Sequence, residues 1–274
     1  MIELPEAVVL SKQLSETLSG RTIRRVVAVH TPHKLSWYFG DPQAYAALLT
    51  GKVIEGATHH GGQVEATAGD ARITFSDGVN LRYFAGGEKA PDKHQLLLEF
   101  DDGSFLVGSV QMYGGLMAFR EGQNDNPYYL VAKEKPSPLS ADFDETYFNG
   151  LFTEGTDKLS LKAFLATEQR IPGIGNGVLQ DILLNARLHP KKRVGTLTAT
   201  EKKLLYESIK TTLAEMVAAG GRDTDTDIFG VPGGYVTTLS KNTVGQPCPV
   251  CGGLIRKEAY MGGSVYYCAS CQAN

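Results

Sequence analysis

Four cysteines at the carboxyl end constrain the fold of this chain more than any other feature. All four lie in the last 27 residues, as a Cys-x-x-Cys pair at Cys248 and Cys251 and a second at Cys268 and Cys271, with 16 residues between the pairs. Each pair occupies a tight turn that directs two thiolates to one point, and Zn²⁺ prefers four such ligands in a tetrahedron. The spacing therefore predicts one zinc site.

The residues between the two pairs predict a β-hairpin that closes this site. Residues 254–260 and 265–267 are typical of strands, and the glycine-rich residues 261–264 are typical of a turn. Four thiolates leave no position for water, so we expect a structural zinc ion and a segment, 241–274, that unfolds without it. Two disulfides are the competing interpretation. A chain with no other cysteine and no secretory signal favours the metal.

Length and composition restrict the class of protein. The chain has 274 residues, of which 42% are hydrophobic and 21% charged, as in globular proteins of one large or two smaller domains. No apolar stretch approaches the roughly 18 residues that cross a bilayer. We therefore expect a cytoplasmic, monomeric protein with no membrane partner.

The first 120 residues predict an antiparallel β-sandwich that begins with a helix. Residues 5–18 have apolar positions at helical spacing, followed by Gly20 as a stop. Short apolar or alternating runs then predict strands, with hairpin turns at Asp77-Gly78 and Asp102-Gly103. The runs cover residues 23–29, 52–55, 63–67, 71–76, 79–84, 95–100, 104–109 and 112–119.

The remainder of the chain changes to a helical pattern. Residues 121–144 are rich in proline and polar residues and predict a linker. Helices are expected at 159–167, 178–188 and 201–219, the last opened by a capping box from Thr198 to Glu201. The predicted fold class is α+β, with a β-sandwich at 1–120, a helical domain at 145–240 and the zinc hairpin at 241–274.

A glycine-rich loop opens the second of these helices. It reads Arg170-Ile-Pro-Gly173-Ile-Gly175-Asn176-Gly, and backbone N–H groups at such a helix start can hold a phosphate, with Asn176 as a further donor. Glycines between helices also serve close packing, which is the alternative interpretation. The cations Arg187, Lys191, Lys192 and Arg193 follow the loop and favour a nucleic-acid backbone as the partner.

The distribution of charge agrees with this assignment. Residues 1–155 carry 13 basic and 20 acidic residues, a net charge of −7, whereas residues 156–274 carry 14 and 10, a net charge of +4. The basic part is where a phosphate backbone would be held. A chance distribution of solvated charges is the alternative.

Together these features resemble the formamidopyrimidine-DNA glycosylase and endonuclease VIII family over essentially the whole chain. Glu3-Leu4-Pro5-Glu6 is similar to the N-terminal signature of that family, residues 174–177 to its helix-two-turn-helix loop, His189-Pro190 to the residues that follow it, and the cysteines to its zinc finger. The resemblance implies a bacterial protein that binds damaged double-stranded DNA, associates with the nucleoid while acting, removes an oxidised or ring-opened base, and then cuts the abasic strand.

The resemblance also implies roles for the N-terminal residues. The family uses an N-terminal proline amine that attacks the sugar C1′ as a Schiff-base nucleophile, and this place is taken by Ile2. Glu3 corresponds to the acid that assists opening of the sugar ring, and Glu6 to a second acid that orients the helix terminus. The acids are retained, whereas the nucleophile has changed.

Three further positions depart from the family pattern. Gln63 stands where a phosphate-binding lysine is usual, and Gly263 where the zinc hairpin usually has an arginine. The side chains that fill the space of an extruded base would be Phe84 and the stretch 111–113, without the usual arginine. The DNA-binding residues implied by the loop, the cations and the family are Gln63, Arg170, Gly173, Gly175, Asn176, Lys191, Lys192 and Arg193.

Three functions fit these observations. The first is an active glycosylase, with or without lyase activity, and the second is a lesion-binding protein that has lost base excision. The third treats residues 172–175 as a helix-hairpin-helix loop of an unrelated DNA enzyme. His59 and His60 are interpreted as turn residues rather than metal ligands, and Trp37 and the two Tyr-Tyr pairs as packing residues. Asp223, Asp225 and Asp227 alternate as cation ligands do, but no calcium loop is completed.

Overall fold

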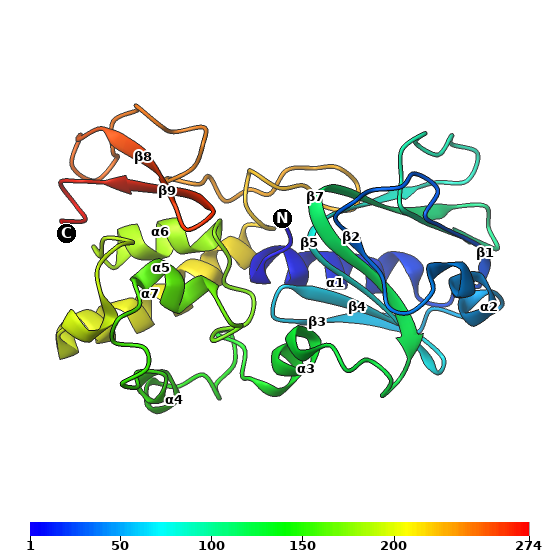
Figure 1. The fold of residues 1–274 in the computed structure, drawn as a ribbon. Helices are drawn as coiled ribbons and strands as arrows, with labels where there is room; N and C mark the ends of the chain where they lie inside the picture. Colours follow the sequence, from blue (N-terminus) through cyan, green and yellow to red (C-terminus); the bar gives the residue numbers. More distant parts are fainter. Residues whose placement is uncertain (274) are drawn as a thin grey trace.

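Helix α1 (Leu4–Leu18) starts the chain and packs on the sheet that follows it. The computed structural model describes residues 1–273 (Figure 1). Glu3 and Glu6 form a capping box at the start of the helix, where Pro5 needs no backbone donor. Leu10, Leu14 and Leu18 recur at helical spacing and are buried, so one stripe of α1 faces strands β3 (Gly56–His60) and β4 (Gln63–Ala68).

The N-terminal part is built on one seven-stranded sheet, in the order β1-β6-β7-β5-β4-β3, with β2 paired in parallel to β7. The longest strands, β5 (Ala71–Phe84) and β7 (Phe105–Arg120), pair with each other at the centre of this sheet. The sheet and α1 enclose a single apolar core. The remaining elements are β1 (Ile23–Ala28), β2 (Ser36–Trp37), β6 (Leu96–Phe100), the 3-10 helix η1 (Pro42–Ala44) and α2 (Tyr45–Leu49).

Three features of the strand prediction were wrong. Asp77-Gly78 is not a hairpin turn: β5 continues through it, and the pairing with β7 shifts between Asp77 and Val79 as a β-bulge. Residues 104–109 and 112–119 likewise form one strand, and residues 52–55 contribute a single bridge at Val53. Turn residues do not distinguish a chain reversal from a bulge, because both need unusual backbone angles. The Asp102-Gly103 turn between β6 and β7 is confirmed.

The segment predicted to be a linker contains helix α3 (Pro127–Glu134). Asn126 caps the helix by accepting from two backbone N–H groups, and Pro127 is its first residue. Tyr129 is buried, and its hydroxyl donates to Glu65 of β4 at 2.6 Å. The connection is therefore attached to the sheet rather than extended through solvent.

The C-terminal part has a second apolar core, formed mainly by helices. These are α4 (Glu145–Gly150), α5 (Leu161–Ala166), α6 (Val178–Asn185) and α7 (Ala199–Ala218), with the 3-10 helix η2 (Val194–Thr196) before α7. The capping box at Thr198 and Glu201 is confirmed. Leu4, from the start of α1, is buried in this second core, so the N-terminus lies between the two parts of the molecule (Figure 1).

The cysteine hairpin packs on helix α6 (Figure 1). Strands β8 (Ile255–Tyr260) and β9 (Gly263–Cys268) are joined by a turn in which Met261 and Gly262 both have positive φ, as in the tight turns that favour glycine. Ile255 and Leu184 bury the contact with the helix. In residues 1–273 no helix has the length and apolar character needed to cross a membrane.

Candidate active site and nucleic-acid interface

A cleft of ≈ 930 Å³ separates the two parts of the molecule. The N-terminal part contributes the chain terminus, strands β2, β5 and β7, and the turn before β4. The C-terminal part contributes α5, the glycine loop and the tip of the cysteine hairpin. The lining includes Ile2, Glu3, Trp37, Gln63, Asp77, Met112, Tyr113, Tyr128, Lys162, Asn176, Gly263 and Tyr266.

Glu3 joins the two parts beneath this cleft. Its side chain is buried, and its Oε1 and Oε2 accept from the backbone N–H groups of Gly177 at 2.8 Å and Val178 at 2.6 Å. Burial raises the pKa of the Glu3 carboxyl, although the charge of Arg222 and the two backbone donors oppose this effect. The two N–H groups at the start of α6 therefore hold a carboxylate of the protein itself.

The glycines of the loop allow this close approach. A Cβ at Gly175 would lie 2.6 Å from Oε1 of Glu3, and a Cβ at Gly173, where φ is +86°, would lie 2.8 Å from Leu4 Cβ and from the backbone of Gly61. Both contacts correspond to the close-packing interpretation of the sequence pattern. The pattern alone does not show whether the anion that approaches such a loop belongs to a ligand or to the chain.

Arg222 was missed by the sequence reasoning. Its guanidinium is buried and forms two bonds to Glu6, Nε to Oε1 at 2.9 Å and Nη2 to Oε2 at 2.7 Å, and its Nη1 lies 3.5 Å from Oε2 of Glu3. A buried carboxylate needs a partner, so two acids in the first helical turn signal a cation from elsewhere. Nothing in the sequence indicates that this cation is Arg222, which follows helix α7.

The N-terminal amine is also engaged. The ammonium group of Met1 pairs with Asp225, and the Met1 carbonyl accepts from Arg222 at 3.3 Å. Ile2, the predicted nucleophile position, is buried, and its backbone N–H donates to the carbonyl of Asp77 at 2.6 Å. Its nitrogen is an amide while Met1 is present, so it offers no amine.

The opposite side of the cleft is closed by contacts between α5, the glycine loop and the hairpin. Asn176 Nδ2 donates to the carbonyl of Ser264 at 3.0 Å, and Lys162 Nζ donates to the carbonyl of Tyr260 at 2.6 Å. Burial lowers the pKa of the Lys162 ammonium group. A Cβ at Gly263 would lie 3.4 Å from this nitrogen. Lys162, which the sequence analysis did not name, therefore lies beside Gly263, where an arginine was expected from the family resemblance.

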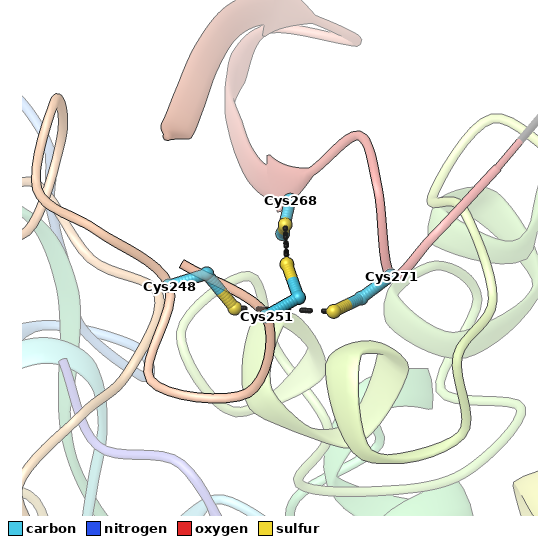
Figure 2. Close-up of side chains that lie close together, drawn as sticks. All are labelled: Cys248, Cys251, Cys268 and Cys271. Atoms are coloured by element: carbon cyan, nitrogen blue, oxygen red, sulfur yellow. Dashed lines mark hydrogen bonds between the residues drawn. The ribbon is translucent and has the colours of Figure 1, made fainter. Parts of the chain in front are cut away.

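The four cysteine sulfurs lie within 4.8 Å of one another (Figure 2). The Sγ atoms of Cys251 and Cys268 are 3.4 Å apart, and those of Cys248 and Cys271 are 3.9 Å apart, too far for disulfides. Zn–S bonds of about 2.3 Å in a tetrahedron place the sulfurs roughly 3.8 Å apart. The Gly253 N–H donates to Cys251 and lowers the pKa of that thiol to about 7. The cluster therefore fits a metal ion.

Comparison with known proteins agrees with the arrangement. Residues 1–107 match the formamidopyrimidine-DNA glycosylase N-terminal domain, and residues 135–227 match the formamidopyrimidine-DNA glycosylase H2TH domain. The formamidopyrimidine-DNA glycosylase of Symbiobacterium thermophilum is 30% identical over 99% of this chain and 89% of its own length. The chain belongs to the formamidopyrimidine-DNA glycosylase family.

Other family members are similar over their full length. A formamidopyrimidine-DNA glycosylase of Bacillus cereus is 27% identical over 99% of each chain. The crystal structure of the MutM (Fpg) protein from Thermus thermophilus superposes with a TM-score of 0.82 at 26% identity, covering 99% of each chain. The fold predicted from the sequence is thereby confirmed.

The cations predicted to contact DNA differ in whether their charged groups already bind other parts of the protein. Arg170 donates to the carbonyl of Phe164 at 2.9 Å and to Glu168 at 2.8 Å. Lys191 pairs with Glu258 and lies over the ring of Tyr260, and Lys192 pairs with Glu201. Arg193 is exposed. None of these four lines the cleft described above, whereas Gln63 does and donates to the carbonyl of Tyr128 at 3.2 Å.

Apolar side chains are exposed at the rim of the cleft, where the sequence analysis had interpreted Trp37 as a packing residue. Trp37 was interpreted as a packing residue but is 45% exposed, and its ring lies 5.6 Å from that of Tyr113. Met112 is 65% exposed beside them. Phe84, one predicted void-filling residue, instead stacks on Phe105 away from the cleft. The void-filling candidates that remain are in the stretch 111–113.

The other polar clusters have structural partners. His59 lies 3.4 Å from the hydroxyl of Ser11, and His60 lies 3.5 Å from Glu65. Asp223 accepts from Thr237, and Asp227 caps the loop after it by accepting from two backbone N–H groups. In residues 1–273 the four cysteines form the one cluster suited to a metal ion.

Proposed function

We propose that this chain is a DNA glycosylase that removes an oxidised or ring-opened base from damaged duplex DNA, acting as a monomer. The observation that carries the proposal is the cleft between the two parts, with the carboxylate of Glu3 at its base and Asn176 on its far side. A base that leaves the stack needs such a pocket. Family members crystallised with DNA, including the Lactococcus lactis Fpg bound to oxidised-pyrimidine DNA, superpose with a TM-score of 0.83 at 26% identity.

The two parts divide the task in this proposal. Residues 1–120 supply the chemistry through Glu3 and Glu6, and residues 121–144 connect them to the helical domain, 145–240. Asn176, Gln63 and the exposed Arg193 contact the phosphate backbone, and Lys162 provides positive charge inside the cleft. The hairpin, 241–274, holds one structural Zn²⁺ through its four cysteines, which fixes the wall on which Asn176 rests.

A base-release assay tests the proposal. Duplexes that each carry one oxidised or ring-opened base are incubated with the protein, and the freed base is identified by mass spectrometry. We expect release from at least one lesion, and a loss of at least about 100-fold in rate for Glu3→Gln, as for removal of a general acid. Tight binding of lesion duplexes without release of any base would instead identify a lesion-binding protein.

A further inference from the structure

Trp37 presents an aromatic ring that the fold itself does not bury. The two residues that follow it are used for packing: Tyr38 lies against the N-terminal apolar core, and the ring of Phe39 lies 5.5 Å from that of Phe119. Trp37 instead lines the cleft and is 45% exposed. A large ring left in contact with water inside a cleft is a candidate binding surface.

The backbone beneath Trp37 is fixed by the sheet. Ser36 and Trp37 pair with Gly114 and Gly115 of β7, and the Gly114 N–H donates to the carbonyl of Leu35 at 3.0 Å. The two glycines have no side chains to cover the indole. A ring that is held by paired backbone loses little freedom when a partner binds it, and such preorganisation favours binding.

Two further side chains extend this surface. The ring of Tyr113 lies 5.6 Å from that of Trp37, and Met112 is 65% exposed beside them. Within residues 1–273, the N-terminal part of the cleft lining includes no lysine or arginine. Phosphates are bound mainly by such cations, whereas the face of a base stacks on aromatic rings. The surface formed by Trp37, Met112 and Tyr113 therefore suits a base.

The place of this surface in the cleft indicates which base it meets. Glu3 is buried beneath the cleft, where the proposed reaction on an extruded nucleotide takes place, whereas Trp37 and Met112 are exposed at the rim. Extrusion of a nucleotide leaves a gap in the duplex, and many DNA-bending proteins insert apolar side chains between bases. The rim therefore faces the bases that remain in the duplex.

We infer that Trp37 stacks on a base beside the gap that the extruded nucleotide leaves, and so holds the duplex in its opened form. The inference rests on the proposed function. It makes Trp37 a positioning residue, which acts through the geometry of the duplex and takes part in no bond change. The preferred partner is a duplex with a gap in its stack rather than an intact one.

Fluorescence measures this contact directly, because Trp37 is the one tryptophan of the chain. The wild-type chain is titrated with a duplex that contains a tetrahydrofuran abasic analogue, and with an intact duplex of otherwise identical sequence. The analogue cannot be excised, so the measurement does not depend on base release. At saturation we expect at least about twofold greater quenching of indole emission by the analogue duplex, because it offers an open base face for stacking.

Substitutions of Trp37 provide the second measurement. Trp37→Ala should lower affinity for the analogue duplex at least about fivefold, the lower end of the effect of losing one base–aromatic stack, and Trp37→Phe should stay within about threefold of wild type. Affinity of Trp37→Ala for the intact duplex should be nearly unchanged. Leu204→Ala is the matched control, because Leu204 is 44% exposed on α7, outside the cleft lining. Urea unfolding checks that each variant is folded.

Three results overturn the inference and leave the proposed function standing. These are equal quenching by the two duplexes, wild-type affinity of Trp37→Ala for the analogue duplex, and an equal loss of its affinity for both duplexes, which would indicate a structural role. Failure of the wild-type chain to bind either duplex overturns the DNA binding on which the proposed function depends, and the inference with it.

Discussion

The two walls of the cleft differ in how far they keep the family pattern. The wall made by the glycine loop and the hairpin retains Asn176, the residues around it and all four cysteines, and departs from the predicted pattern at Gly263. The wall made by the sheet and the N-terminus has Ile2 at the predicted nucleophile position, Gln63 at the predicted phosphate position and Met112 at the rim. Affinity for a duplex comes mainly from contacts to its backbone, whereas the reaction depends on a few groups near one sugar. The comparison teaches that the glycine loop and the cysteine cluster can be kept while the residues predicted to lie near the reacting sugar change.

The walls also differ in what holds them. The sheet wall rests on a large apolar core and on buried ion pairs around Arg222, whereas the hairpin has only a small cluster at Ile255 and Leu184. A small segment that cannot bury enough apolar surface needs a bound metal ion to fold, and we expect this of the hairpin. Four experiments separate these contributions.

Removal of the metal should have the largest effect. Structural Zn²⁺ contributes about 10 kcal/mol or more to the folding of small metal-dependent segments, so chelation or Cys268→Ser should unfold the hairpin. Asn176 then loses its partner at Ser264, and duplex affinity should fall at least about 100-fold in fluorescence anisotropy. Circular dichroism should still show the sheet, and added Zn²⁺ should restore the chelated wild type. Unchanged affinity would show that the hairpin is not needed for binding.

Replacement of Arg222 by Met should rank second. Glu3 and Glu6 would remain buried without their cation, which costs about 3–5 kcal/mol in comparable buried pairs. Urea unfolding measures the loss. Arg193→Met is the control, because Arg193 is exposed, and its change should stay within about 0.5 kcal/mol. If Arg222→Met and Arg193→Met lower the free energy of unfolding equally, the buried ion pairs around Arg222 do not stabilise the sheet wall.

Gly175→Ala should lower the free energy of unfolding by an intermediate amount, because Gly175 lies where the glycine loop contacts the N-terminus. The added Cβ lies 2.6 Å from Oε1 of Glu3, and overpacking of this kind costs about 1–3 kcal/mol. Gly150→Ala is the matched control, because a Cβ there meets no atom within 4 Å. A stability of Gly175→Ala equal to that of Gly150→Ala would mean that Glu3 is not held against the loop.

The smallest effect should come from a single surface cation. Arg193→Ala should weaken duplex binding at every sequence and reduce the slope of log affinity against log salt by about one. Arg170→Ala should leave this slope unchanged, because its guanidinium already binds Phe164 and Glu168. Binding isotherms at several salt concentrations test both. A change of slope for Arg170→Ala alone would reverse the assignment.

Local patterns in the sequence predicted much of this structure. The cysteine spacing, the capping box at Thr198 and the amphipathic helices depend on neighbouring residues, so they could be recognised directly. The partner of Glu6 could not be predicted, because Arg222 is 216 positions away in the chain. The bulge at Asp77 could not be predicted either, because it depends on the pairing of β5 with β7 and resembles a turn in sequence. Residues with distant partners therefore form the part of the site that required the structure.

The position of the N-terminus has a consequence for the order of synthesis. Leu4 is buried against helices that follow residue 143, Glu3 accepts from Gly177 and Val178, and Met1 pairs with Asp225. Domains fold largely in the order in which the ribosome releases them. The first residues translated nevertheless reach their final contacts only after the chain has been made up to Asp225. A chain that ends before Arg222 lacks the cation that pairs with Glu3 and Glu6, so we expect its N-terminal residues to be without their final contacts.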